Sequence, residues 1–400
     1  MRILFVSPFL PYPPVAGGHR QIWSWMKRLA RGHETAFVGF FERESEAAGA
    51  AEVERVCAET RVRLRKPTAH GYTSLAQMPR AASEFFCREL AEDVAGMVRS
   101  FRPDVVQFLA INMAQYRRWT GETPWVVTAL DIAFVAHRRA IAARRGLERL
   151  RARCEWLRML RYEAAAFRRA DHVLAVSSHD ARIVAAVGGH ERVTAVPPGV
   201  DREEMSPRDR APAPGSVLYV GHMEHYPNLD GLLFLYRDIW PHVRHAYPRA
   251  KLTVAGGRTR EELAREAPET LARMERDASV ELAGFVPDLH GLMDGTAVMA
   301  APMRLGSGVR NKVIEAMAVG LPVVTTSLGA EGLAARHERE LLIAEEPAAF
   351  GREVVRLLKG DDLQSRLSAA GRELVARDHD NDRLAKRLEH ALARAAGARA

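Results

Sequence analysis

The chain has 400 residues, 47% hydrophobic and 27% charged, which is typical of a soluble protein and long enough for two domains. No apolar run approaches the roughly 18 residues that span a bilayer, and the N-terminus resembles a strand more than a signal peptide, so we expect a cytoplasmic protein. Three scattered cysteines and unclustered histidines predict no disulfides and no metal, while the net charge of +8 favours an anionic substrate or membrane surface over nucleic acid.

The first residues predict a strand, a turn and a helix. Residues 2–7 form an apolar strand, and a proline-rich loop then leads through Gly17 and Gly18 into a helical pattern. Such a turn lies at the carboxyl edge of a parallel sheet, where open α/β folds bind ligands. Two adjacent glycines are a weak signal alone, but they make Gly18 and His19 candidate site residues.

Another predicted strand, at 125–131, ends in a carboxylate. Asp131 is its last residue, and His137 follows six positions later. Either side chain could contact a substrate at the edge of the sheet. The alternative is that Asp131 caps the next helix and His137 lies on the surface.

The segment 137–169 predicts an arginine-rich amphipathic helix. Its apolar stripe comprises Leu147, Leu150, Cys154, Leu157 and Leu160. A charged helix is usually just a solvated one. The excess of arginine beside leucine also fits contact with an anionic membrane surface.

A charged, proline-rich stretch at 202–214 predicts a linker between two domains. The second half then repeats the pattern of strand, glycine turn and helix. Its strands are expected at 216–221, 251–257, 280–286, 297–302 and 323–326.

The stretch 301–333 predicts an anion site. A turn with Gly306 and Gly308 leads into a helix that starts near Val309 or Arg310 and ends at Gly320. The first amides of a helix lack internal partners and favour negative charge. Arg310 and Lys312 stand in this first turn, where cations oppose the helix dipole, and a diphosphate would explain them.

The same helix has two predicted faces. Its apolar residues Val313, Ile314, Ala316 and Met317 can cover the sheet. Asn311, Lys312 and Glu315 share the other side, so Glu315 could accept hydrogen bonds from ribose hydroxyls one turn beyond a phosphate. The alternative is a surface ion pair between Lys312 and Glu315 of little consequence.

This segment resembles the donor-site motif of retaining glycosyltransferases of family 4 with the GT-B fold, in a bacterial branch. The branch pattern is P-x-R-x-G-S-G-x-R-x-K-x-x-E-A-M-A-x-G-x-P-V-V. Here it is matched by Pro302, Arg304, Gly306, Ser307, Gly308, Arg310, Lys312, Glu315 to Ala318, Gly320 and Pro322 to Val324. The wider family carries two glutamates eight positions apart, and the first of them is Ser307 here.

The resemblance implies a fold of two Rossmann-like α/β domains that face a cleft. The expected boundaries are an acceptor-side domain at 1–201, a linker at 202–214, a donor domain at 215–378 and a last helix at 379–400 that crosses back to the first domain.

The resemblance also implies roles for individual residues. The donor would be held by Gly18, Gly221, His222, Val286, Ser307, Gly308, Val309 and Glu315. His19 would lie on the acceptor side, and Arg310, Lys312, Asp131 and His137 would be catalytic, with no metal and no cofactor.

The expected activity is retaining transfer of a sugar from a nucleoside diphosphate to a hydroxyl acceptor, in glycan, exopolysaccharide, glycolipid or natural-product synthesis. The acceptor would be a glycan, a lipid-linked molecule or a small molecule. Two alternatives remain. One is a nucleotide-sugar epimerase on the same fold, and the other is a non-catalytic nucleotide- or sugar-binding partner of a synthesis complex.

Overall fold

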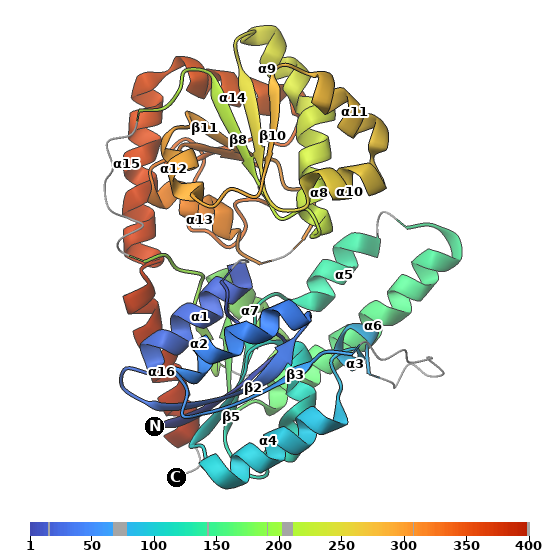
Figure 1. Cartoon of the computed structure of the whole chain (residues 1–400), viewed down its shortest axis with the longest axis vertical. Coiled ribbons are helices and arrows are strands. Elements are labelled where there is room, and N and C mark those ends of the chain that lie inside the picture. The colour runs from blue at the N-terminus through green and yellow to red at the C-terminus, as the bar shows by residue number, and fades with distance from the viewer. Residues whose placement is uncertain are drawn as a thin grey trace. The chain divides into compact units, whose positions relative to one another are not determined.

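The computed structural model describes residues 1–14, 17–66, 78–141, 144–189, 191–201, 211–306 and 308–397. The chain divides into two compact units, which are described separately (Figure 1). Unit 1 comprises Met1–Pro198 and Asn381–Ala400, and unit 2 comprises Gly199–Asp380. Most of the predicted linker, 202–210, and Ser307 lie outside the described residues.

Unit 1 is built on a seven-stranded parallel sheet in the order β3-β2-β1-β4-β5-β6-β7. Its elements are β1 (Arg2–Ser7), α1 (Gly17–Leu29), β2 (Glu34–Phe41), η1 (Glu44–Gly49), α2 (Ala50–Glu54), β3 (Glu59–Leu64), α3 (Arg80–Ser83), α4 (Arg88–Phe101), β4 (Val105–Phe108), η2 (Ile111–Trp119), β5 (Trp125–Ala129), α5 (Ala133–Ile141), α6 (Gly146–Arg169), β6 (His172–Ala175), α7 (Ser178–Gly188), β7 (Val193–Ala195) and α16 (Asn381–Gly397).

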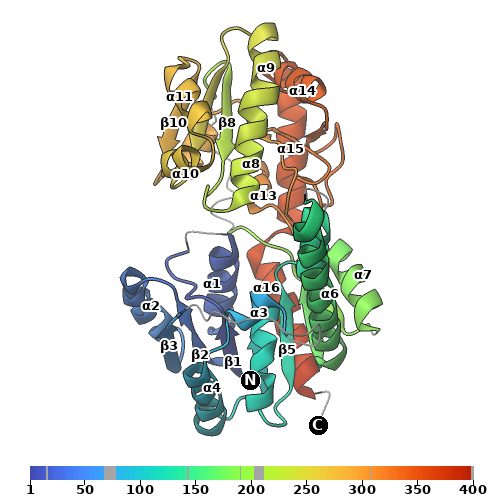
Figure 2. The ribbon, with the colours of Figure 1, turned by 90° about the vertical axis from the view of Figure 1, so that its right-hand side faces the viewer.

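Both faces of this sheet are covered, because successive residues of a strand point to opposite sides. Ile3 and Phe5 of β1 pack on one side with α1 and α16. Leu4 and Val6 pack on the other side with α4 and the end of α6. The last helix, α16, therefore belongs to the core of unit 1, beside α1 (Figure 2).

Unit 2 contains a six-stranded parallel sheet in the order β10-β9-β8-β11-β12-β13. Its elements are β8 (Ser216–Val220), α8 (Tyr226–Phe234), the π-helical turn η3 (Leu235–Ile239), α9 (Trp240–Ala246), β9 (Lys251–Ala255), α10 (Thr259–Glu266), α11 (Pro268–Arg276), β10 (Val280–Gly284), α12 (Leu289–Asp294), β11 (Val298–Ala301), α13 (Asn311–Ala318), β12 (Val323–Thr325), β13 (Leu342–Ile343), α14 (Pro347–Lys359) and α15 (Asp361–Asp378).

The core of unit 2 also has two sides. Val217 and Tyr219 of β8 pack with α8, α9 and α14. Leu218 packs on the other side with α13 and α15. The predicted apolar face of α13 is confirmed, since Val313, Ile314, Ala316 and Met317 are all buried in this second cluster.

The prediction of one helix over 137–169 is wrong. The segment forms two helices, α5 and α6, that pack side by side as a hairpin (Figure 1). α6 begins at Gly146, whose φ of 54° lies in the left-handed region that favours glycine, and this backbone conformation breaks the helical run.

Candidate functional site

The predicted donor residues of unit 2 gather at the carboxyl edge of its sheet. β9 and β10 extend the sheet on one side of β8, and β11 to β13 extend it on the other, so the strand order reverses between β8 and β11. Open α/β sheets bind ligands at such a point. Gly221 and His222 follow β8 there, and the turn 302–310 follows β11.

Two glycines let the turns after β8 and β9 approach closely. A Cβ atom on Gly256 would lie 1.7 Å from the carbonyl oxygen of Gly221, and the φ of Gly256 is 151°. A Cβ atom on Gly221 would lie 2.9 Å from the side chain of Asn228. Only glycine fits at Gly256, and the exposed His222 follows Gly221 in this turn.

Lys312 reaches from α13 to the end of β8. Its amine donates hydrogen bonds of 2.8 Å to the Val220 carbonyl and 2.8 Å to Oδ1 of Asn228. The Nζ atom also lies 5.0 Å from the centre of the Tyr219 ring. Within the described residues, Lys312 forms no ion pair with Glu315, so the structure does not support the alternative of a surface pair.

The amine of Lys312 is electrostatically unusual. Removal from water, together with the positive charge of Arg310, lowers its pKa to about 7, and Glu315 opposes this shift. The same two cations contribute, after removal from water, to a lowered pKa for His225 at the start of α8. Burial and the neighbouring positive charges therefore disfavour the charged forms of Lys312 and His225.

Arg310 lies at the N-cap of α13 and folds back on the glycine turn. Its guanidinium donates to the carbonyls of Gly308, at 2.9 Å, and Leu305, at 3.4 Å. Gly306 and Gly308 have φ values of 101° and 75°, so both need the left-handed region. Arg310 thus shapes the turn that leads into the helix. Val309, which stands between Gly308 and Arg310 in the sequence, is half-buried.

Glu315 is 6% exposed on α13, one turn after Asn311. Val286 is half-buried after β10 and packs on the same core, while the neighbouring Phe285 is 71% exposed. Glu315 lies on the helix that follows β11, and Val286 lies after β10, the strand at the edge of the sheet. Their contacts with a donor remain a prediction.

Sequence reasoning assigned no role to Asn228. Its side-chain amide donates to the His222 carbonyl at 3.0 Å, and its backbone carbonyl accepts from the Tyr219 hydroxyl. Together with the bond from Lys312, these contacts fix the turn after β8. The pair Pro227-Asn228 was visible in the sequence, but only the structure brings it to Lys312.

Arg304, a motif residue, has a structural contact. Its guanidinium pairs with both carboxylate oxygens of Asp230, at 3.1 and 2.7 Å, and lies 4.2 Å from the centre of the Phe234 ring. These contacts fasten the turn after β11 to α8.

In unit 1, Gly18 and His19 lie in the first turn of α1. The His19 ring stacks on Phe9, with centroids 4.1 Å apart, and burial lowers its pKa against the opposing charges of Glu46 and Glu42. The stacked ring is held in the first turn of α1, which follows β1.

Asp131 and His137 lie at the end of β5 and on the helix α5 that follows it. Asp131 is exposed two residues after β5. His137 is half-buried on α5, where burial lowers its pKa and the charges of Glu155 and then Asp131 partly offset the shift. Asp131 does not cap α5. The amides of Ala133 and Phe134 donate instead to the carboxylate of Glu163, at 3.0 and 2.8 Å.

Glu163 is the second residue that sequence reasoning missed. It is fully buried on α6, and burial raises its pKa to about 8 against the two amide bonds. It anchors the start of α5 and so sets the turn that carries Asp131. The residue pattern around Glu163 gave no signal in the sequence for this contact.

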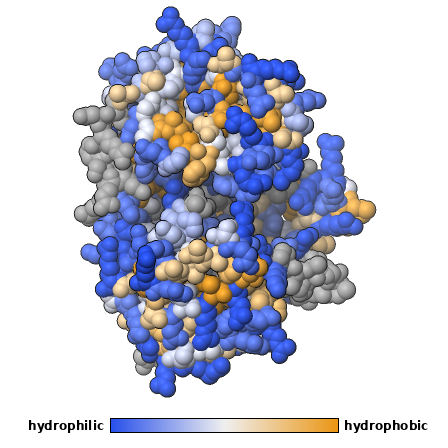
Figure 3. Space-filling view, viewed as in Figure 1, coloured by the Kyte–Doolittle hydropathy of each residue, from blue (hydrophilic) through white to orange (hydrophobic). Residues whose placement is uncertain are grey.

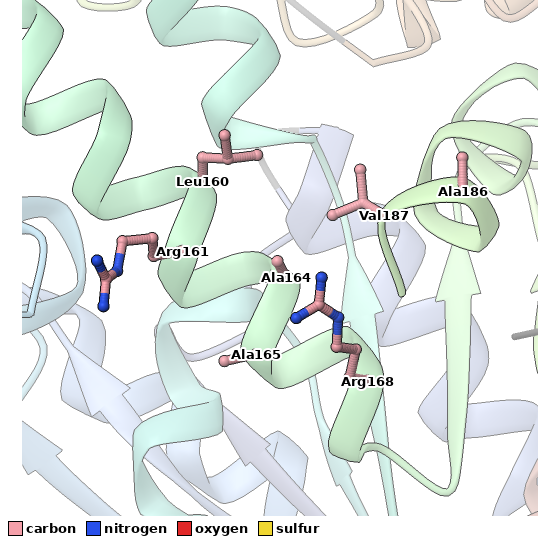
Figure 4. Close-up of a pocket in the computed structure, with 7 residues that line it drawn as sticks. All are labelled: Leu160, Arg161, Ala164, Ala165, Arg168, Ala186 and Val187. Carbon is pink, nitrogen blue, oxygen red and sulfur yellow. The ribbon is translucent and has the colours of Figure 1, made fainter. Parts of the chain in front are cut away.

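A pocket of about 580 Å³ lies between α6 and α7 of unit 1 (Figure 4). Its lining residues are Leu160, Arg161, Ala164, Ala165, Arg168, Ala186 and Val187. The Arg168 guanidinium lies between the two helices beside Ala164, whereas Arg161 points away (Figure 4). None of the predicted site residues lines this pocket.

No helix in the described ranges is long and apolar enough to cross a membrane. Over the same ranges, no cluster of three or more histidine, cysteine, aspartate or glutamate side chains could hold a metal ion.

Two family descriptions match the two halves of the chain. Residues 16–199 match the glycosyl transferase 4-like domain, and residues 214–360 match the glycosyl transferases group 1 domain. An uncharacterized 44.6 kDa protein from the cps region of Klebsiella pneumoniae is 29% identical over 145 residues. That match spans 36% of this chain and 37% of the length of the curated relative.

Solved structures share the fold over nearly the whole chain. The HepE protein of Anabaena, in complex with UDP-glucose, is 13% identical with a TM-score of 0.71, covering 98% of this chain and 99% of its own. The sucrose-phosphate synthase of Thermosynechococcus elongatus is 16% identical with a TM-score of 0.70, covering 98% of each chain. These likenesses show a shared fold of two parallel-sheet α/β units.

Proposed function

The chain belongs to the glycosyltransferases of the GT-B fold, and from this premise we propose that it transfers a sugar from a nucleoside-diphosphate donor to a hydroxyl acceptor with retention of configuration. The observation that carries the proposal is Lys312. Its amine is held at the end of β8 by two neutral acceptors, at the start of α13, with no carboxylate paired to it in the described structure.

The proposed chemistry is stabilisation of the departing diphosphate. The amides at the start of α13, the Lys312 ammonium and the Arg310 guanidinium would meet charge that grows as the sugar leaves. With cations supplied by the protein, the proposal needs no metal. Glu315 would bind the ribose, and Asp131 with His137 would act on the sugar and its acceptor.

The donor class is supported by the HepE structure, which contains UDP-glucose. We place the reaction in glycan or polysaccharide synthesis, which the relative from the Klebsiella cps region supports. The acceptor is proposed to be a glycan, a small molecule or a lipid-linked molecule reached by a cytoplasmic enzyme in peripheral contact with an anionic membrane.

The test begins with thermal shifts in a panel of nucleoside diphosphates, followed by mass spectrometry of candidate acceptors incubated with the matching nucleotide sugar. We expect a stabilising diphosphate, an acceptor that gains one sugar, and unchanged turnover in EDTA. NMR of the product reports the anomeric configuration. Conversion of the donor without acceptor would indicate an epimerase, and binding without release of free diphosphate would indicate a non-catalytic partner.

A further inference from the structure

Lys312 differs from the many cations on the surface of the chain. The sequence contains 58 lysines and arginines, and hydrophilic side chains predominate on the face shown in Figure 3. An exposed cation therefore marks no particular place on this chain. Lys312 is half-buried, and removal from water lowers the pKa of its amine, so its place in the fold disfavours its own charge.

The Lys312 ammonium has one donor left over. An ammonium group carries three N–H bonds. Two of them point to the Val220 carbonyl and to Oδ1 of Asn228, each at 2.8 Å. Within the described residues, the third N–H has no hydrogen-bond partner. One acceptor alone would let the ammonium rotate about that bond, so the second acceptor fixes the direction of the third N–H.

Asn228 supplies this second acceptor, and its own amide is held in turn. Nδ2 of Asn228 donates to the His222 carbonyl at 3.0 Å, so Oδ1 faces Lys312. The reverse orientation would bring the NH2 group against the ammonium and the oxygen against a carbonyl. The backbone is held as well, because the Asn228 carbonyl accepts from the Tyr219 hydroxyl and its amide donates to the His225 carbonyl at 2.8 Å.

Of the two side chains with this shape, asparagine and aspartate, only asparagine meets both requirements. One short planar group has to donate to a backbone carbonyl and accept from a cation at the same time. An ionised carboxylate has no N–H or O–H to donate. It would also neutralise the ammonium, whereas the amide oxygen of Asn228 orients the ammonium and leaves its charge available to an anion.

The groups around the amine supply little negative charge. Removal from water and then the positive charge of Arg310 lower the pKa of Lys312, and Glu315 opposes them. From α8, His225 also has a lowered pKa, through removal from water and then the charges of Arg310 and Lys312. From β8, the Tyr219 ring lies 5.0 Å from the amine. Glu315 is the only anion among these groups, and it forms no ion pair with Lys312 in the described structure.

We propose that Asn228 is a positioning residue for donor binding, which directs the third N–H of Lys312 to the diphosphate without neutralising the ammonium. This role rests on the proposed function, since it needs a diphosphate at the start of α13. Lys312 lies in the first turn of α13 and Asn228 in the first turn of α8, so their contact joins two helix starts. The amides of both helix starts favour negative charge.

The first experiment is a double-mutant cycle on the full chain with inorganic pyrophosphate, which carries the diphosphate without a base or a sugar. Titration calorimetry without divalent metal compares the wild type, Asn228→Ala, Lys312→Gln and the double variant. Asn228→Ala should weaken binding about tenfold, as expected when a hydrogen bond to a charged group is lost. In the Lys312→Gln background, the same change should weaken binding less than about twofold, because the side chain that Asn228 directs is gone.

The second experiment changes the charge of the contact and keeps its shape. Asn228→Asp should pair with the ammonium, raise the pKa of Lys312 by at least about one unit, and weaken pyrophosphate binding about tenfold at about pH 6. At about pH 8 the wild-type amine is mostly neutral and the amine of the variant stays charged, so the two affinities should converge. The titration of the probe itself cancels in this ratio.

NMR of chains with carbon-13 at Cε of lysine measures the pKa of Lys312 without any ligand. The sequence contains six lysines, and the signal of Lys312 is the one that Lys312→Gln lacks. Gln364→Glu is the matched control, because the side-chain amide of Gln364 on α15 also donates to a backbone carbonyl, that of Leu357, at 2.7 Å. It should change neither the pKa of Lys312 nor the affinity. Circular dichroism melts check that each variant is folded.

Two results would overturn the role of Asn228 alone. One is a double variant in which the two losses multiply. The other is Asn228→Asp with wild-type affinity at about pH 6 and an unchanged pKa of Lys312. Either result leaves diphosphate binding by the wild type intact. A wild-type chain that binds no pyrophosphate would overturn the proposed diphosphate site and this role with it.

Discussion

Lys312 combines two properties that rarely coincide in one lysine. Its amine is fixed by hydrogen bonds to Val220 and Asn228, and its pKa is lowered to about 7. Fixation means that little side-chain entropy would be lost when a phosphate arrives, and the lowered pKa means that the bare site disfavours the charged form. A bound diphosphate would reverse that preference.

Replacement of Lys312 tests its role directly. Lys312→Gln should reduce turnover at least tenfold, the effect expected when a charge contact to the transition state is lost. Lys251→Gln is the matched control, because Lys251 bonds to the Ala278 carbonyl at the start of β9 and lies at the amino edge of the same sheet. Steady-state kinetics of both variants would decide, and unchanged turnover in Lys312→Gln would contradict the assignment.

The pKa of Lys312 also predicts how diphosphate binding depends on pH. In the free chain, the amine loses its proton as pH rises through about 7, and a bound diphosphate raises the pKa above that value. Binding above pH 7 therefore takes up a proton, and affinity should fall by up to about tenfold per pH unit. Titration calorimetry in buffers of different ionisation enthalpy measures this uptake, which Lys312→Gln should abolish.

At the scale of elements, the site depends on where strands end and helices begin. The sequence pattern predicted the turn at 306–308, the start of α13 to within about two residues and the apolar side of that helix. These features follow from local residue types: glycines, the 3.6-residue period and a proline after Gly320. They could be read without tertiary information.

Other features depend on contacts between distant residues and could not be read in this way. Glu163 accepts the first amides of α5 from a position 29 and 30 residues further along the chain. Asn228 meets Lys312 across 84 residues. The stripe of α6 was predicted, but its exposure depends on which side of the helix packs against unit 1, and the periodic pattern does not specify that side.

The close contact of the turns after β8 and β9 gives a prediction at this scale. Gly256→Ala should cost several kcal/mol of unfolding free energy, because its Cβ atom would lie 1.7 Å from the Gly221 oxygen and must separate the two turns. Gly284→Ala is the control. Its φ of 65° carries a cost of about 1 kcal/mol, but nothing lies within 4 Å of the new methyl group. Equal losses in urea denaturation would contradict this reading.

At the scale of the whole molecule, the two units have separate cores, and the end of the chain completes the first of them. Leu384, Leu388 and Leu392 of α16 are buried with Ile22 and Trp25 of α1. Each leucine contributes roughly 1.5–3 kcal/mol through burial, so unit 1 is incomplete when α16 is missing.

Fragments of the chain test this division. Residues 199–380 should fold alone, with a cooperative thermal transition, and bind the diphosphate that stabilises the full chain. Residues 1–198 should lack a cooperative transition and regain one when 381–400 is fused to them. Circular dichroism melts of the three proteins suffice, and a stable 1–198 fragment would show that α16 is dispensable.

The lowered pKa of Lys312 has a chemical consequence beyond binding. An amine that is about half deprotonated near pH 7 is a nucleophile at a pH where ordinary lysines are almost entirely ammonium. A phosphate-bearing aldehyde should therefore form an imine at Lys312 first, and borohydride would make the label permanent for peptide mapping. Nucleoside diphosphate should protect the lysine from labelling.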